Sequence, residues 1–301
     1  MIKRTLCFSN PGKLRLHLRQ LLWCGEDGKE ASVPIEDLGI VILESPLITV
    51  SIALLQALTE SCVAVVLCDA SHLPSGYILP QASHTLASRF LRNQIELTDA
   101  QSGRLWQQIV IRKIQNQASV IRTLNPQKAN ELFEMAEFVK RGDVTNIEAQ
   151  AAKLYFTAFP ISEDVFHRSR YGTMPNAALN YGYAILRAAV ARCLVASGLN
   201  TILGIHHCNQ YNHFCLADDV MEPYRPFVDA VVLEHLEAFE KAEEPTQLST
   251  KGKQILLPFL IMDVRIGEST RPLFNALQLT TASLARCICN EQKTLELPTF
   301  P

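Results

Sequence analysis

The spacing of apolar residues changes once along this chain, after roughly its first quarter, and this change restricts the folds open to it. Before the change, short alternating runs such as residues 13–18 (Lys-Leu-Arg-Leu-His-Leu) are separated by turn sequences, a pattern typical of β-strands. From Ser88 onward, apolar residues recur at helical spacing. The sequence therefore predicts an α+β fold, with a small β-rich domain at residues 1–76, a linker at 77–87 and a larger all-α catalytic domain at 88–301.

Two helices of this second part have recognisable patterns. The first has an apolar stripe at Trp106, Val110, Ile114, Ala118 and Ile121. The cations beside the stripe are Arg104, Arg112, Lys113 and Arg122. Because cations on the polar side of an amphipathic helix usually form a solvated face, we expect most of them to be exposed. The second helix opens near Asn176, runs to about Ser197 and is apolar nearly all round, so it is predicted to be central and buried.

Composition limits the class of protein and its compartment. With 48% hydrophobic and 19% charged residues among 301, the chain is typical of a soluble globular protein. Its nine cysteines show no pairing rhythm and no signal peptide opens the sequence, so we expect a reducing, cytoplasmic environment. The apolar region 39–58 is interrupted by Glu44 and Pro46 and is not expected to span a membrane.

The net charge and the distribution of charge point in different directions. A formal net charge of −2 argues against a nucleic-acid partner. Lys and Arg are nevertheless concentrated in residues 81–128, and acidic residues in 229–244. This segregation permits a basic face on an acidic protein.

The connection at residues 203–226 is rich in ionisable groups between strongly apolar flanks. These groups are His206, His207, His213, Asp218, Asp219, Glu222 and Arg225. Pro223 and Pro226 fit only the first turn of a helix, so the acids lie at a helix entrance, where the dipole favours negative charge. Capping would explain one lone acid, whereas three acids with a histidine pair favour a hard metal such as Mg²⁺ or Mn²⁺. Zinc is disfavoured, because the spacing of Cys208 and Cys215 differs from that of structural zinc sites.

Four residues outside this connection are candidates for the same site or for DNA binding. Glu148 either closes a capping box with Thr145 or supplies a third metal ligand from a distant helix, and spacing leaves both open. Asn176 is either a helix N-cap or a residue that orients metal ligands. Arg168 and Arg170 either hold phosphates or are solvated.

Several segments together make the chain resemble a known family. They are residues 34–39 (Pro-Ile-Glu-Asp-Leu-Gly), 65–69 (Val-Val-Leu-Cys-Asp), 105–106 with 113–118, 148–155, 175–183, and 204–207 with 219–226. They are similar, in order and over nearly the whole chain, to the CRISPR-associated endonuclease/integrase of spacer acquisition. This is the first and most widespread Cas protein, here in the variant found with type II systems.

The resemblance implies a fold, partners and a set of site residues. It implies a β-rich N-terminal domain, a helical catalytic domain and a homodimer that joins a small ferredoxin-like adaptation subunit, with other type II CRISPR proteins as candidate partners. The implied activity is the metal-dependent insertion of captured double-stranded DNA fragments into a CRISPR array. The implied ligands of Mg²⁺ or Mn²⁺ are Glu148, His207 and Glu222, with Asp219 close by. The ligand is placed on His207, three residues after Gly204, although the adjacent His206 leaves the register ambiguous by one.

The residues themselves agree with this chemistry. A metal held by two carboxylates and one imidazole can polarise a phosphodiester that is attacked in line by a DNA 3′-hydroxyl or by water. Asp219 and Asn176 are then expected to orient the ligands. Two other functions compete: a catalytically decayed DNA-bridging subunit of the same complex, and a small-molecule metal hydrolase.

Overall fold

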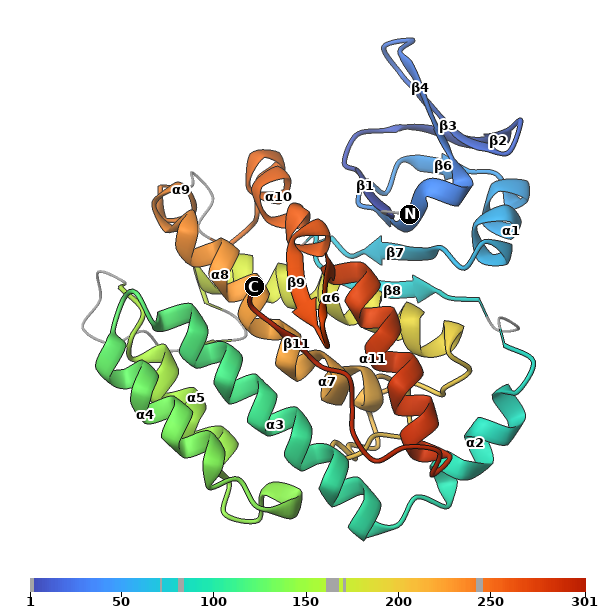
Figure 1. Cartoon of the computed structure of the whole chain (residues 1–301). Helices are drawn as coiled ribbons and strands as arrows, with labels where there is room; N and C mark the ends of the chain where they lie inside the picture. Colours follow the sequence, from blue (N-terminus) through green and yellow to red (C-terminus); the bar gives the residue numbers. More distant parts are fainter. Residues whose placement is uncertain (1–2, 71, 81–83, 161–167, 170–171, 242–245) are drawn as a thin grey trace.

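Residues 3–70 and 72–78 fold as strands around a short helix in the computed structural model, which describes residues 3–70, 72–80, 84–160, 168–169, 172–241 and 246–301. The elements of this strand-rich part are β1 (Arg4–Phe8), β2 (Gly12–His17), β3 (Gln20–Gly25), β4 (Glu30–Pro34), η1 (Ile35–Asp37), β5 (Leu38–Leu43), β6 (Ile48–Val50), α1 (Ile52–Glu60), β7 (Ala64–Cys68) and β8 (Pro74–Ile78). Figure 1 shows them at one end of the molecule.

Two four-stranded sheets make up this part, with strand orders β1-β5-β7-β8 and β4-β3-β2-β6. The central strand β5 reads Leu-Gly-Ile-Val-Ile-Leu without polar alternation, because both of its faces are covered. Ile40 and Ile42 face the core of the helical part, whereas Leu38 and Val41 face a smaller core under the second sheet and α1. The first sheet is therefore a wall shared by both cores.

The rest of the described chain is mainly helical (Figure 1). Its elements are α2 (Ala87–Ile95), α3 (Asp99–Ile121), α4 (Pro126–Glu137), η2 (Arg141–Asp143), α5 (Ile147–Phe156), α6 (Asn176–Ala196), α7 (Cys215–Met221), η3 (Glu222–Tyr224), α8 (Arg225–Glu234), α9 (Leu236–Glu240), α10 (Thr250–Leu256), η4 (Leu257–Ile261), β9 (Asp263–Ile266), β10 (Ser269–Pro272), α11 (Leu273–Ile288) and β11 (Pro298–Thr299). Within the described residues, no helix is both long and apolar enough to span a bilayer.

A β-rich part followed by a helical part confirms the predicted α+β class. The helical part is not all-α, however, because β10, β9 and β11 form a small antiparallel sheet. These strands have four residues or fewer, which is too short to give a period in the sequence. Strand β8 reaches Ile78, so strand structure also continues past residue 76.

The apolar faces of the two patterned helices are buried as predicted, whereas the expectation that most of the cations on α3 are exposed is wrong. The apolar stripe of α3 is confirmed, since all five of its residues are buried, and α6 is buried on nearly all sides. The expectation of a solvated side chain is wrong for Lys113, which is only 7% exposed. Arg104 and Arg112 are half-buried, and Arg122 is exposed as expected.

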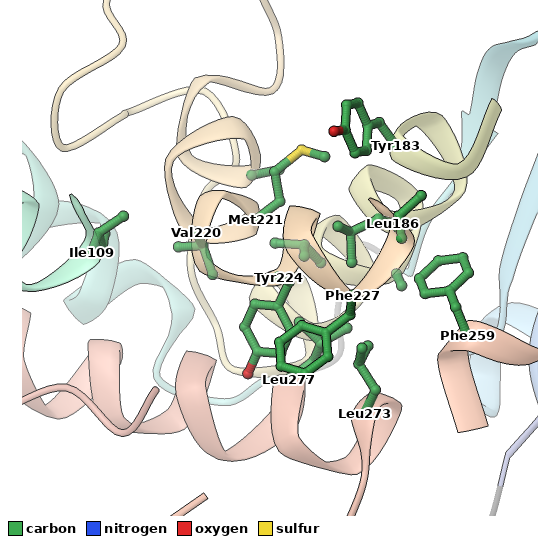
Figure 2. Packing of buried hydrophobic residues seen from close by; sticks show 14 of the residues in the cluster. Ile109, Tyr183, Leu186, Val220, Met221, Tyr224, Phe227, Phe259, Leu273 and Leu277 are labelled. Carbon is green, nitrogen blue, oxygen red and sulfur yellow. The ribbon is translucent and has the colours of Figure 1, made fainter. Parts of the chain in front are cut away.

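The ionisable connection enters the core as α7, η3 and α8, which pack against α3 and α6. Pro223 and Pro226 lie in the first turns of η3 and α8, as predicted. Tyr224 and Phe227 point toward α11 (Figure 2), and Tyr224 Oη lies 2.6 Å from Thr280 Oγ1. The apolar contacts and the hydrogen bond that this short segment makes with α11 on one side thus hold in place the carboxylates on its other side.

Candidate active site

Two glutamates from separate helices meet at one lysine. Glu148 stands in the first turn of α5, Glu222 opens η3, and Lys113 projects from α3 between them. Lys113 Nζ donates a hydrogen bond to Glu148 Oε1 and lies 2.5 Å from Glu222 Oε2. The chain thereby brings together, around a positive charge, two carboxylates that are 74 positions apart in the sequence (222 − 148).

The helix that carries Glu148 begins differently from the prediction. Helix α5 starts after Asn146, and its first N–H groups, those of Ile147 and Glu148, both donate to the carboxylate of Asp143 at 2.9 Å. Asp143 therefore does the work of a capping residue, and the Glu148 carboxylate is turned to Lys113 instead of back to Thr145. The capping-box interpretation of Glu148 is wrong.

Glu222 is buried and held as an anion. Its side chain is 6% exposed, and its Oε1 lies 2.9 Å from Arg225 Nε. Burial alone would raise its pKa, but the charges of Arg225 and Lys113 lower the pKa of Glu222 to about 2. Asn116, on the same face of α3 as Lys113, donates to the carbonyl oxygen of Pro223 at 2.8 Å and fixes η3 against α3. Glu222 Oε2 lies 2.5 Å from Lys113 Nζ, so each carboxylate oxygen of Glu222 has a cationic neighbour.

Lys113 is charged in spite of its burial. Burial opposes its positive charge, but the carboxylates of Glu222 and Glu148 outweigh this effect and raise its pKa. A protonated lysine is thus the resident cation of the pair of glutamates.

Asp219 fixes the histidine doublet. This fully buried carboxylate accepts hydrogen bonds from the backbone N–H groups of Ile205, His206 and His207 at 2.5, 3.0 and 3.1 Å, and its Oδ1 lies 2.6 Å from His207 Nδ1. The loop approaches so closely that a Cβ on Gly204 would lie 2.2 Å from the carbonyl oxygen of His207. Only glycine therefore fits at this position.

The two histidines of the doublet have different surroundings. The ring of His206 stacks on Trp106, with ring centroids 4.2 Å apart and an interplanar angle of 2°. The hydrogen bond with Asp219 raises the pKa of His207 against the opposing effect of burial, with a further contribution from the charge of Glu222. When Nδ1–H of His207 donates to Asp219, Nε2 is left with its lone pair, as metal binding requires.

Asn176 and Arg168 hold each other. Arg168 Nη1 donates to Asn176 Oδ1 at 2.9 Å, and the backbone N–H of Ser169 donates to the same oxygen at 2.9 Å. Helix α6 begins at Asn176 with Pro175 at the N-cap position, so the N-cap interpretation of Asn176 is wrong. Arg170 lies outside the described residues.

An arginine-lined groove opens beside this site. A cavity of about 880 Å³ is bordered by Arg168, Arg187 and Arg225, together with Asn212 and the exposed Tyr211. The guanidinium groups of Arg168 and Arg225 lie 5.1 and 4.7 Å from the ring centre of Tyr183. Arg187 is held by Asp218, with Nε 2.6 Å from Oδ1. Fixed arginines along a groove are suited to binding the phosphates of a nucleic acid.

The described residues contain no group of three His, Cys, Asp or Glu side chains placed to hold a metal as they stand. Lys113 instead occupies the space between the two glutamates. The donor types still suit Mg²⁺ or Mn²⁺, because the carboxylates of Glu222 and Glu148 and the oriented imidazole of His207 offer oxygen and nitrogen ligands. The residues therefore fit such an ion once the lysine moves.

Sequence reasoning gave no role in the site to Lys113, Arg225 or the buried pair of Tyr183, which lines the groove, and Asp229. Tyr183 Oη donates to Asp229 Oδ1 at 2.5 Å, and burial raises the pKa of Asp229 to about 6. One signal was available for Lys113. It precedes Ile114 and follows Val110 by three residues, so it borders the apolar stripe of α3.

Comparisons with known proteins place the chain in a family. The family model described as "CRISPR associated protein Cas1" matches residues 6–259. The CRISPR-associated endonuclease Cas1 of Neisseria meningitidis serogroup C (strain 8013) is 37% identical over 300 residues, which cover 99% of this chain and 96% of that protein.

Solved structures have the same fold at low sequence identity. A casposase bound to its integration product has a TM-score of 0.82 at 18% identity, covering 98% of this chain and 93% of its own. A chain of a Cas6-RT-Cas1–Cas2 complex has a TM-score of 0.76 at 20% identity, covering 98% of this chain and 36% of its own. Given the family match over most of its length, this chain belongs to the Cas1 family of CRISPR-associated proteins.

Proposed function

We propose that this protein is a metal-dependent DNA endonuclease and integrase that inserts captured DNA fragments into a CRISPR array by phosphodiester transesterification. The observation that carries the proposal is the convergence of Glu148 and Glu222, from helices distant in sequence, on one cationic position beside an arginine-lined groove. The endonuclease name of the Neisseria relative and the integration product bound to the casposase support the same chemistry.

Glu148, Glu222 and Nε2 of His207 would hold the Mg²⁺ or Mn²⁺ ion. When bound, such an ion supplies Lewis-acid polarisation of the scissile phosphate and neutralises its developing charge. Asp219 keeps the imidazole in one tautomer and one orientation, which preserves Nε2 as a lone-pair donor. Asn176 would act indirectly, because it accepts a hydrogen bond from Arg168. Arg168 and Arg225 both lie over the ring of Tyr183, and Arg225 contacts Glu222.

The arginines of the groove position the DNA. Arg168, Arg187 and Arg225 would bind backbone phosphates and set the strand so that a DNA 3′-hydroxyl, or water in the nicking reaction, attacks in line. Arg170 is proposed to act with Arg168. The reaction needs no covalent protein–DNA intermediate, since the nucleophile is supplied by the DNA or by solvent.

The assembly proposed here is a homodimer built through residues 1–76, together with a small ferredoxin-like adaptation subunit, double-stranded DNA and other type II CRISPR proteins. The Cas1–Cas2 assembly among the structural neighbours supports a partner of this kind. Pairing strand-rich domains covers exposed sheet edges and separates two active sites, one for each end of a fragment. Light scattering should give about twice the chain mass of 33.6 kDa for the full chain, and a monomer at micromolar concentration would contradict the dimer. A reducing cytoplasm is the proposed location, consistent with nine cysteines that are all free.

A catalytically decayed DNA-bridging subunit is the second candidate, and the lysine between the two glutamates favours it. A strand-transfer assay on supercoiled DNA, with and without Mn²⁺, separates the two. Joining that requires Mn²⁺ and is lost in Glu148→Ala and Glu222→Ala supports the integrase. DNA binding without nicking or joining would support the decayed subunit. A protein that neither binds nor cuts DNA would return the small-molecule hydrolase to consideration.

A further inference from the structure

Lys113 is a buried charged side chain that the proposed chemistry leaves without a role. Its ammonium group contacts Glu148 Oε1 and Glu222 Oε2, and its side chain is 9% exposed. An ammonium group is unfavourable in such surroundings unless nearby charges compensate for the lost hydration, and the two carboxylates provide that compensation. The same two carboxylates are the anionic donors proposed for the metal ion.

We propose that Lys113 fills the cation position of the metal-free site and is displaced when a divalent cation binds; this inference rests on the proposed metal-dependent function. A lysine ammonium and a divalent ion repel each other and compete for the same oxygen atoms, so both cannot occupy this buried space. Lys113 is therefore a positioning residue. It holds the two glutamates together before the metal arrives.

The contacts of Glu222 show which atom is released in the exchange. Arg225 Nε lies 2.9 Å from Oε1, so Glu222 keeps one cationic neighbour after Lys113 leaves. Oε2 lies 2.5 Å from Lys113 Nζ, and this oxygen becomes available when the ammonium group leaves. The flexible four-carbon stem of lysine allows its ammonium group to swing away from α3, and a DNA phosphate at the same site is the anionic partner it would then meet. Metal binding without DNA is weakened, because it separates Lys113 from both carboxylates.

The test is a calorimetric titration of the full-length, DNA-free protein with Mn²⁺. Lys113→Met should bind Mn²⁺ at least about tenfold more tightly than the natural protein, equivalent to ~1.4 kcal/mol, because no lysine has to be displaced. Lys113→Gln keeps a hydrogen-bond donor for the carboxylates without the charge, and it should show the same gain in affinity for Mn²⁺. It takes the place of Lys113→Met in the test if the methionine variant folds poorly. Lys253→Met is the matched control, since Lys253 is another buried lysine paired with a buried carboxylate, that of Glu44.

Two melting curves for each protein complete the test. In EDTA, Lys113→Met and Lys253→Met should both melt at lower temperature than the natural protein, and Mn²⁺ should restore only Lys113→Met. The exchange is overturned if both Lys113 variants bind Mn²⁺ no more tightly than the natural protein does. The proposed function still stands in that case, provided that the natural protein binds Mn²⁺ and that this binding depends on Glu148. Absence of Mn²⁺ binding in all of these proteins would overturn the metal site itself.

Discussion

Replacing Asp219 with Asn should damage both the fold and the site, because four contacts depend on its two oxygens. Oδ2 accepts from the N–H groups of Ile205 and His206, and Oδ1 accepts from the N–H of His207 and contacts Nδ1 of its ring. An asparagine amide presents its NH₂ group to one of these two sets in either orientation. Two charge-assisted hydrogen bonds, each contributing ~1.5–3 kcal/mol, are then replaced by contacts between donors. We expect the free energy of unfolding to fall by about 3 kcal/mol after local relaxation.

Urea denaturation followed by circular dichroism measures this loss, and a nicking assay with Mn²⁺ measures the effect on the site. Since His207 loses the group that orients its ring, activity should fall by about 10–100-fold even where the protein is folded. Asp218→Asn is the matched control, because this neighbouring carboxylate bonds the side chains of Arg187 and Asn212 and no backbone N–H of the histidine loop. The free energy of unfolding of Asp218→Asn should fall by about 1 kcal/mol. Natural stability and activity in Asp219→Asn would refute the role assigned to this carboxylate.

Three further predictions concern the histidines, the groove and the buried core. His207→Ala should abolish metal-dependent nicking. His206→Ala removes a ring that stacks on Trp106 and packs edge-on against His207, but it leaves the contact between His207 and Asp219 in place and should retain most of the activity; the reverse ranking would move the ligand to His206. Replacing Arg168 and Arg187 together should reduce the slope of log affinity for DNA against log salt by about 0.9 per lost phosphate contact, and an unchanged slope would show that neither binds a DNA phosphate. The raised pKa of Asp229, about 6, means that the folded state holds its proton more tightly than the unfolded state does. The contribution of Asp229 to stability is therefore complete below about pH 4 and lost as the pH rises through about 6. Between these values the free energy of unfolding of the natural protein should fall by about 2–3 kcal/mol more than that of Asp229→Asn. Parallel curves of stability against pH from urea denaturation would contradict this.

The features predicted correctly are those that depend on the periodicity of residues within one segment. The apolar stripe of α3 and the prolines that open η3 and α8 depend only on spacing within one segment, and each has its predicted place. The change from strand to helix is visible for the same reason. Such patterns report which face of an element is buried.

The features that were missed depend on contacts between segments. Asp143 replaces the expected capping box because the chain before α5 bends back to offer its carboxylate, which no spacing rule describes. Lys113 was taken for a solvated cation because its partners, Glu148 and Glu222, come from other helices. Periodicity cannot show that a charge at the border of an apolar stripe will be compensated by acids from elsewhere.

An anomalous difference map from a crystal soaked in Mn²⁺ tests most directly whether Glu148, His207 and Glu222 form a metal site. We predict a single strong peak bordered by both glutamate carboxylates and by Nε2 of His207, with the Lys113 ammonium group turned away from Glu222. The structure with the ion bound should retain the contact between His207 and Asp219. No peak at saturating Mn²⁺, with Lys113 still between the two carboxylates, would contradict the metal-dependent mechanism.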